Sequence, residues 1–214
     1  MPERSKLVVA ARAVIAILYL VGIVGFSMPA SRELFAELSP LNLCLSVVLL
    51  LWFQEHWSVK TLLSIVIVVL IGFGAELLGT RTGLLFGNYK YGPVLGIKVW
   101  ETPLLIGANW LVLCYGIYVL LSRFRLQWRL PVVGAALMVA FDFVMEPVAT
   151  QLNIWSWQDG HIPFKNYLDW FLVSFFLFAG MNFLKLNLRN QLAVWIIMCQ
   201  FIFFLVLNFS LNLL

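Results

Sequence analysis

Charge is scarce in this sequence, and its scarcity excludes most soluble folds. Only 11% of the 214 residues are charged, whereas a soluble globular domain carries about 25%. Hydrophobic residues make up 63% of the chain, and long apolar runs recur from one end to the other. A helix of about 20 apolar residues crosses the hydrocarbon core of a bilayer. The composition therefore predicts an integral membrane protein.

Metal ligands and thiols are also few. The chain has two histidines, His56 and His161, and three cysteines that all fall inside apolar runs, Cys44, Cys114 and Cys199. No His-Cys-Asp cluster has ligand spacing, and the cysteines are typical of packing rather than of a disulfide framework. We expect no metal and no cofactor, and a histidine-box desaturase or hydroxylase is excluded.

Two further binding classes lack support. The glycine-rich segment 79–96 does not have the Gly-Lys-Ser/Thr ending of a P-loop, and its glycines favour a tight re-entrant or lid segment. The net charge of +4 does not imply a nucleic-acid partner, because basic residues that flank membrane spans usually set topology. The partners that remain are membrane lipid and a lipophilic ligand.

Seven apolar runs predict an all-α, polytopic helix bundle that forms a single membrane domain over residues 1–214. The first run follows Arg4 and Lys6 but has no clear cleavage site after it, so we interpret it as a retained helix rather than a signal peptide. We expect a multi-pass protein of the cytoplasmic membrane. The seven expected spans are Leu7–Phe26, Leu38–Phe53, Thr61–Gly79, Pro103–Leu121, Leu130–Thr150, Tyr167–Leu186 and Leu192–Leu214.

The distribution of Lys and Arg predicts the orientation. If the N-terminus is cytoplasmic, the inside segments carry nine of these residues and the outside segments carry five. Cytoplasmic segments normally hold the excess, which favours an N-in, C-out topology. Three of the five exceptions, Arg81, Lys90 and Lys98, lie in one loop. The alternative is that this loop is inside and that the short run 38–53 does not cross the membrane.

Carboxyl groups within the spans are the strongest functional signal, because an ionisable residue in a bilayer is costly. Because successive spans alternate in direction, the five acids that lie within or next to the third to sixth spans fall in the same leaflet of the membrane. Helical rise places Asp142 about 12 Å and Glu146 about 6 Å inside the end of their span. The acids of this leaflet are Glu76, Glu101, Asp142, Glu146 and Asp169.

Asp142 and Glu146 are four residues apart, so they share a helix face. Two carboxyls on one face in a low dielectric resist ionising together, and we expect one to keep its proton at neutral pH. A retained proton is what an acid catalyst for an unactivated double bond needs. The alternative is that these acids form ion pairs with Arg81, Lys90 or Lys98 and simply hold the helices together.

Aromatic and amide side chains gather in the same layer of the membrane. An interfacial aromatic belt explains part of this set, but the opposite face has no comparable tyrosine and asparagine cluster. Aromatic faces can also stabilise a cation. The residues are Asn88, Tyr89, Tyr91, Trp100, Asn109, Trp110, Asn153, Trp155, Trp157, Asn166, Tyr167 and Trp170.

The order of these motifs resembles the carotenoid biosynthesis membrane protein family, which includes the carotenoid 1',2'-hydratases and bisanhydrobacterioruberin hydratase. The resemblance covers roughly residues 72–170. Two acids fit it less well, since Asp169 stands where a glycine is expected and Glu101 lies outside the pattern. The matching segments are Glu76-Leu-Leu-Gly79-Thr-Arg-Thr-Gly83, Phe86-Gly87-Asn-Tyr89-Lys-Tyr91, Leu95-Gly96, Pro103, Asp142-Phe-Val-Met-Glu146-Pro147, Trp155-Ser-Trp157, Ile162-Pro163, Asn166-Tyr167 and Trp170.

The resemblance implies a cofactor-independent hydro-lyase that adds water across the terminal double bond of an acyclic or monocyclic carotenoid. Its catalytic acids would be Asp142, Glu146 and Glu76, with Asp142 as general acid. Arg81 would set the ionisation of these acids. The other expected substrate-binding residues are Tyr89, Tyr91, Trp110, Trp155, Trp157, Asn166 and Trp170.

Two other functions fit the same residues. A lycopene-cyclase-like isomerase would begin with the same protonation and capture the cation with an internal alkene. A proton-coupled transporter would also gather carboxyl groups near a cavity, but the sequence has no internal repeat of the kind many transporters show.

Overall fold

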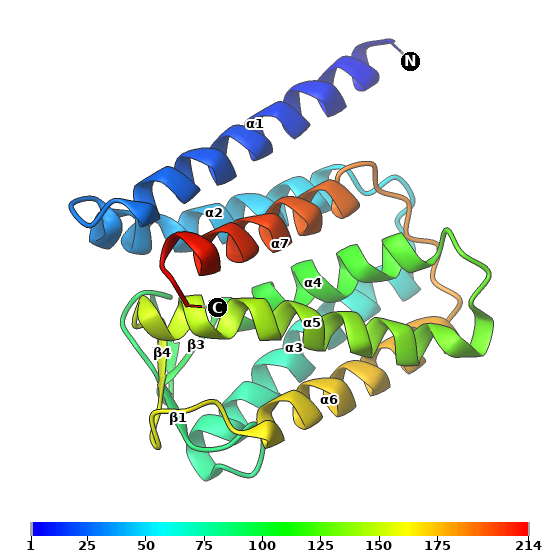
Figure 1. The fold of residues 1–214 in the computed structure, drawn as a ribbon. Helices are drawn as coiled ribbons and strands as arrows, with labels where there is room; N and C mark the ends of the chain where they lie inside the picture. The colour runs from blue at the N-terminus through cyan, green and yellow to red at the C-terminus, as the bar shows by residue number, and fades with distance from the viewer. Residues whose placement is uncertain (1, 214) are drawn as a thin grey trace.

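The fold is a bundle of helices with four very short strands at one end (Figure 1). The structure is a computed structural model that describes residues 2–213. Within this range each of the seven expected spans corresponds to one helix, which confirms the all-α class. The helices are α1 (Pro2–Ser27), α2 (Arg32–Trp52), α3 (Val59–Thr82), α4 (Leu105–Leu121), α5 (Leu130–Gln151), α6 (Phe164–Phe183) and α7 (Ala193–Ser210), with a 3₁₀ turn at Gln127–Arg129 before α5.

Five of these helices, α1, α2, α3, α5 and α7, are long and apolar enough to cross a bilayer. Helix α4 is apolar but has only 17 residues, and α6 carries Lys165 and Asp169 in its first turns. The expected start of α2 at Leu38 is wrong, because the helix already begins at Arg32. Glu33 and Glu37 interrupt the apolar run, so the first turns of the helix were not included in the expected span. The protein is therefore a multi-pass membrane protein.

Local capping fixes several helix ends. The Ser58 hydroxyl accepts a hydrogen bond from the Thr61 N–H at 3.1 Å and caps the start of α3. Gly83 ends this helix with φ of 67°, a left-handed conformation that glycine adopts without steric cost. The Asn190 side-chain oxygen accepts from the N–H groups of Leu192 and Ala193 at 2.8 and 3.0 Å and begins α7.

Helix α4 forms the centre of the bundle, and most of its side chains are buried. It packs against α2, α3, α5 and α7, while α5 lies along α6. Helix α1 is peripheral: it packs mainly on α2 and α7, and most of its apolar side chains remain exposed (Figure 1). The core that positions buried polar groups is therefore built by α3 to α7.

Two pairs of short strands close one end of the bundle. Strand β1 (Tyr89–Tyr91) pairs antiparallel with β4 (Trp155–Trp157), and Tyr91 faces Trp155 across the ladder. Strand β2 (Lys98–Val99) pairs with β3 (Thr102–Pro103) in a hairpin. The glycine spacing predicts a re-entrant or lid segment here, and the pairing of strands was not predicted.

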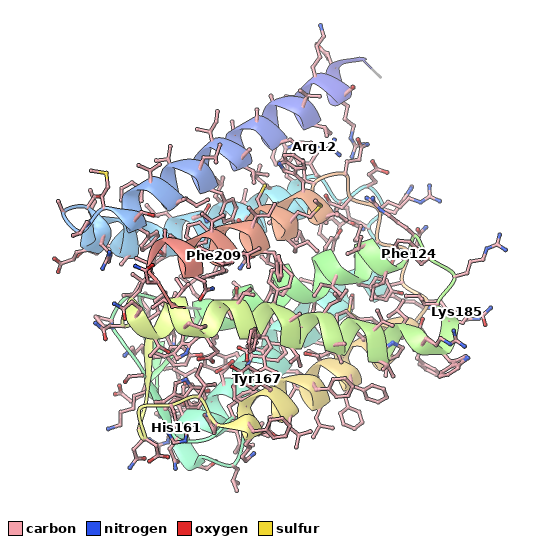
Figure 2. All side chains as sticks on the ribbon, viewed as in Figure 1. Arg12, Phe124, His161, Tyr167, Lys185 and Phe209 are labelled. Carbon is pink, nitrogen blue, oxygen red and sulfur yellow. The ribbon has the colours of Figure 1, made fainter. Side chains whose placement is uncertain are left out.

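The chain termini lie at opposite ends of the bundle. The N-terminus is far from the strands, whereas the C-terminal end of α7 lies on the same side as the strands (Figure 1). Arg12 and Lys185 lie toward the N-terminal end, and His161 lies near the strands (Figure 2). The end that carries the strands is thus the end to which the sequence assigns the buried acids.

Candidate functional site

Three of the five acids come together in one small pocket below the strands. Glu76 of α3 and Asp142 and Glu146 of α5 all line it, and each is at most 3% exposed. Asp142 and Glu146 lie on the same face of α5, as their spacing predicts. The pocket has a volume of about 10 Å³, which is room for about one water molecule.

Glu76 is held by hydrogen-bond donors on both of its oxygens. Its Oε2 accepts from the hydroxyls of Tyr89 at 2.5 Å and Tyr91 at 2.7 Å. Its Oε1 accepts from the Trp110 indole N–H at 3.0 Å. A side chain on Gly79 would lie 2.9 Å from the Tyr89 hydroxyl, so this contact requires glycine there. Glu76 is therefore fixed in position from three directions.

The two tyrosines lie in strand β1, outside the helices. Burial raises the pKa of both hydroxyls well above the usual value, and the neighbouring Glu76 carboxyl raises it further. Tyr89 and Tyr91 therefore keep their protons at neutral pH and act as permanent donors to Glu76.

Glu146 is held from the opposite strand. Its Oε2 accepts from the indole N–H groups of Trp155 and Trp157, both at 2.9 Å. Successive side chains of a strand point to opposite faces, so residues two apart share one face. Strand β4 has this alternation, with both tryptophans buried and Ser156 exposed between them. The strand thus places two donors side by side over one carboxyl oxygen.

Asn166 of α6 links Asp142 and Glu146. Its Nδ2 donates to Asp142 Oδ2 at 2.5 Å and to Glu146 Oε1 at 3.4 Å. Asp142 Oδ1 is buried and has no hydrogen-bond partner among the described residues. The three acids therefore differ: Glu76 has both oxygens occupied, Glu146 has one weakly bonded oxygen, and Asp142 has one free oxygen.

The ion pairs offered as an alternative for these acids are not observed. Between residues 2 and 213 the ion pairs are Lys165–Asp169 and Arg4–Glu55. Lys98 instead donates to the Tyr91 carbonyl at 2.7 Å. In the described part of the chain, the three pocket acids thus have hydrogen-bond donors around them but no cation.

Arg81 does not belong to the pocket, contrary to the expectation that it tunes the acids. Its side chain is exposed, and it is absent from the pocket lining. The helix rotates by about 100° per residue, so five residues beyond Glu76 the side chain faces a different direction. Lys90, which alternates with two buried tyrosines in β1, is exposed as well.

The two remaining acids also lie outside the pocket. Asp169 accepts from the Phe86 N–H at 2.7 Å and pairs with Lys165, so it fastens the loop before β1 to α6. Glu101 is exposed in the turn between β2 and β3. These positions agree with the departures from the family pattern found at both residues.

Aromatic rings enclose the acids. Trp110 and Trp170 stack with ring centroids 4.3 Å apart. Across the strand pair, Tyr89 lies 5.1 Å from Trp157, and Tyr91 lies 5.9 Å from Trp155. All the expected binding residues except Arg81 and Trp110 line the pocket, and Trp110 reaches it through its hydrogen bond to Glu76. A cation formed inside the pocket would face several π systems.

Three residues that line the pocket, Phe86, Ile106 and Met145, were not among the predicted site residues. Phe86, with a φ of 63°, and Met145 both lie in segments that match the family pattern, and this was the available signal. Ile106 is an apolar residue in an apolar helix, so nothing in the sequence distinguishes it from lipid-facing or core positions.

Known proteins give an independent indication of identity. The sequence profile described as "Carotenoid biosynthesis protein" matches residues 39–214. A bisanhydrobacterioruberin hydratase from Haloarcula japonica is 31% identical over an alignment of 147 residues, which covers 61% of this chain and 48% of that protein. The chain thus matches about half the length of this relative. No solved structure matches the chain. Because the profile covers most of the chain, this protein belongs to the carotenoid biosynthesis protein family.

Proposed function

We propose that this protein is a hydro-lyase that adds water across the terminal, 1',2' double bond of an acyclic or monocyclic carotenoid. The observation that carries this proposal is the pair of available carboxyl oxygens, Asp142 Oδ1 and Glu146 Oε1, in an aromatic enclosure with no cation among the described residues. Membership of the family and the 31% identity to a hydratase from Haloarcula japonica support the same reaction class.

Asp142 is the general acid in this mechanism. A hydrogen bond donated to a carboxylate favours its charged form, and Asp142 receives one such bond, fewer than Glu76 or Glu146. The protonated Asp142 gives its proton to the less substituted carbon of the terminal isopropylidene group. The π electrons of the double bond form the new C–H bond, and a tertiary carbocation remains at the other carbon.

Glu146 is the general base. A water molecule attacks the tertiary cation through oxygen, and Glu146 Oε1 takes one of its protons, which leaves a tertiary alcohol. Exchange of this proton with Asp142 through the next water restores the starting state. The sum is one alkene and one water giving one alcohol, so no cofactor is needed. The rings of Trp155, Trp157, Tyr89 and Tyr91 stabilise the cation.

Glu76 has a different role in this proposal. Because Tyr89, Tyr91 and Trp110 donate to both of its oxygens, Glu76 is held more tightly than Glu146 or Asp142 and is less suited to transfer a proton. In its ionised form, its charge and fixed position place a favourable potential beside the developing cation. We therefore assign proton transfer to Asp142 and Glu146, and electrostatic stabilisation to Glu76.

The test is coexpression of the chain with enzymes that make an acyclic carotene, followed by mass spectrometry of the pigments. The wild type should give a product heavier by one water, and Asp142→Asn and Glu146→Gln should give none. Glu101→Gln changes an exposed carboxyl at the same end of the bundle and should leave the yield unchanged. A pigment of unchanged mass but altered retention would indicate the cyclase-like isomerase, and full activity of Asp142→Asn would remove Asp142 from its role.

A further inference from the structure

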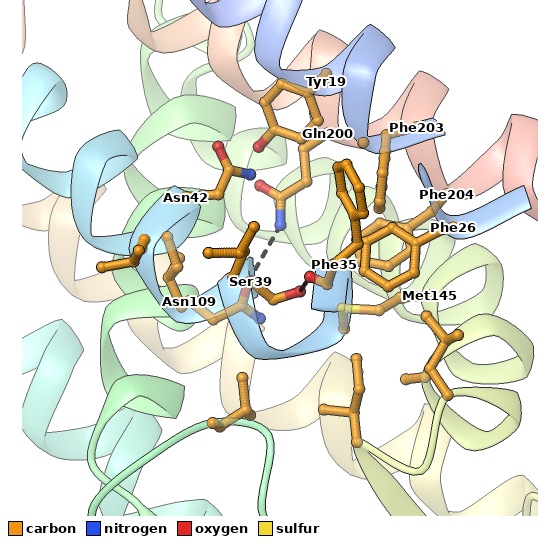
Figure 3. Close-up of a pocket in the computed structure, with 18 of the residues that line it drawn as sticks. Tyr19, Phe26, Phe35, Ser39, Asn42, Asn109, Met145, Gln200, Phe203 and Phe204 are labelled. Atoms are coloured by element: carbon orange, nitrogen blue, oxygen red, sulfur yellow. Dashed lines mark hydrogen bonds between the residues drawn. The ribbon is translucent and has the colours of Figure 1, made fainter. Parts of the chain in front are cut away.

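A second, much larger cavity lies beside the acid pocket. It has a volume of about 430 Å³ and is enclosed by α1 and α2 on one side and by α4, α5 and α7 on the other (Figure 3). Pockets that bind small organic ligands have volumes of about 300–1,000 Å³. The cavity is thus large enough for part of a long hydrocarbon, whereas the acid pocket is not.

The two spaces share one wall. Ile106, Met145 and Trp155 line both the large cavity and the acid pocket. The acid pocket has room for about one water molecule, so a substrate double bond can enter it beside that water only if side chains of the shared wall move aside. A double bond that meets Asp142 must therefore approach across this shared wall.

The cavity reaches the lipid-facing surface between α1 and α2. Four of its lining residues, Leu18 and Val21 of α1 and Leu38 and Leu41 of α2, are 40% to 65% exposed. By helical rise these residues lie about 9 to 14 Å from the adjacent helix ends, and half of the hydrocarbon core is about 15 Å thick. The opening therefore faces the acyl chains of the bilayer rather than water.

Few polar side chains interrupt the apolar lining, and they lie close together. Tyr19, Asn42 and Gln200 turn toward one another, and Gln200 Nε2 donates to Asn109 Oδ1 at 3.2 Å (Figure 3). Gln200 Oε1 has no partner in the described part of the chain. The cavity thus suits a long apolar chain.

We propose that this cavity is the binding site for the isoprenoid chain of the carotenoid. The chain enters sideways from the bilayer between α1 and α2, and its terminal double bond passes between Ile106 and Met145 into the aromatic enclosure, beside Asp142. The rest of the polyene stays in the lipid. This inference deepens the proposed hydratase function and rests on it for the identity of the ligand.

The test uses variants that fill the cavity with a larger side chain, and it measures pigment binding separately from hydration. In the Asp142→Asn background, which cannot turn over, carotenoid that copurifies with the protein is measured by its visible absorbance. Ser39 lines the cavity on α2, and its hydroxyl bonds only a carbonyl of its own helix. Adding Ser39→Trp should reduce bound pigment by at least about tenfold, a loss of about 1.4 kcal/mol in binding.

Two further variants decide the outcome. Leu38→Trp adds the same bulk at the partly exposed mouth, where folding should tolerate it, and should also reduce bound pigment. Leu70→Trp adds it at an exposed position of α3 outside the cavity and should not. Pigment retained at the parental level by folded Ser39→Trp or Leu38→Trp protein would overturn the proposal.

The two proposals can fail independently. If the wild type yields no hydrated pigment, the hydratase proposal fails, and pigment retention still decides whether the cavity binds polyenes. If the wild type hydrates its substrate and Ser39→Trp and Leu38→Trp hydrate it equally well in the otherwise wild-type chain, the function stands and the cavity assignment fails.

Discussion

At the scale of single residues, the number of hydrogen-bond partners distinguishes three chemically similar acids. Burying a carboxyl without a partner is costly, and the protein meets this cost differently at each site. Glu76 receives two hydroxyls and an indole, Glu146 receives two indoles, and Asp142 receives only one amide on one oxygen. The least satisfied group, Asp142, has one oxygen with no hydrogen-bond partner among the described residues.

The hydroxyl of Tyr91 should matter for stability as well as for activity. Tyr91→Phe removes one of two donors to Glu76 Oε2 and leaves a buried polar group less satisfied, which costs about 1–3 kcal/mol. Thermal unfolding in detergent should show a lower midpoint than the wild type. Tyr167→Phe is the matched control, since no hydrogen bond of the Tyr167 hydroxyl occurs within residues 2–213. Equal midpoints for both variants would contradict the role of Tyr91.

The sequence predicted the acids and most of their neighbours because polar groups stand out against an apolar background. Asp142 and Glu146 were identified by their depth and spacing, and the structure places them in one pocket with Glu76. Arg81 was wrongly assigned to the site because closeness to Glu76 in sequence does not determine which way its side chain points at the end of a helix. Ile106 and Met145 were not predicted because their importance lies in separating the acid pocket from the large cavity, and a sequence does not show cavities.

At the scale of secondary structure elements, the β1–β4 pair organises the site from outside the membrane helices. It brings together side chains from two loops that are distant in sequence, and its four aromatic residues supply four of the donors to Glu76 and Glu146. In antiparallel pairs the side chains of non-hydrogen-bonded positions lie closest. The Gly92 N–H donates a hydrogen bond to the Ile154 carbonyl at 2.8 Å, and this places the facing aromatic residues at such positions.

Breaking this ladder should therefore abolish the site without disturbing the bundle. Ser156 lies opposite Lys90 in the ladder, with its own side chain exposed. Ser156→Pro removes a backbone donor from the centre of the strand, so the two tryptophans should no longer be held over Glu146. We expect loss of hydrated product with unchanged helical circular dichroism. Ser156→Ala keeps the backbone donor and should retain activity. Activity in the proline variant would contradict the role of the β1–β4 pair in forming the site.

The helices were predictable from sequence because each is a long apolar run, whereas the strands were not. Each strand of the β1–β4 pair has three residues, too few for a clear periodic signal, and its partner lies in a different loop. The alternation of aromatic and polar residues in Tyr89-Lys-Tyr91 and Trp155-Ser-Trp157 was the available evidence. The start of α2 was missed because the acidic residues in its first turns make this part of the sequence resemble a loop.

At the scale of the whole molecule, the positions of the termini make the predicted orientation testable. The N-terminus and the strands lie at opposite ends, and Arg12 and Lys185 lie toward the N-terminal end (Figure 2). The excess of Lys and Arg predicts that the N-terminal end is cytoplasmic. The acid pocket then lies in the half of the membrane away from the cytoplasm.

Reporter fusions should reveal this orientation directly. A fluorescent protein that matures only in the cytoplasm should fluoresce at the N-terminus and not at the C-terminus, while alkaline phosphatase should be active only at the C-terminus. The reverse pattern would show that the charge rule fails here. Matching signals at both ends would show that one of the seven helices does not cross, with α6 and the 17-residue α4 as the first candidates.

The peripheral place of α1 has a consequence for how this molecule relates to its family. The family profile begins at residue 39, within α2, so α1 and the first turns of α2 lie outside the matched segment. Leu18 and Val21 of α1 and Leu38 of α2 form the unmatched part of the opening to the large cavity, whereas Leu41 and every acid of the pocket lie inside the matched segment. In the proposed binding mode, the substrate thus passes between a helix that the family profile does not match and one that it matches from residue 39 onward.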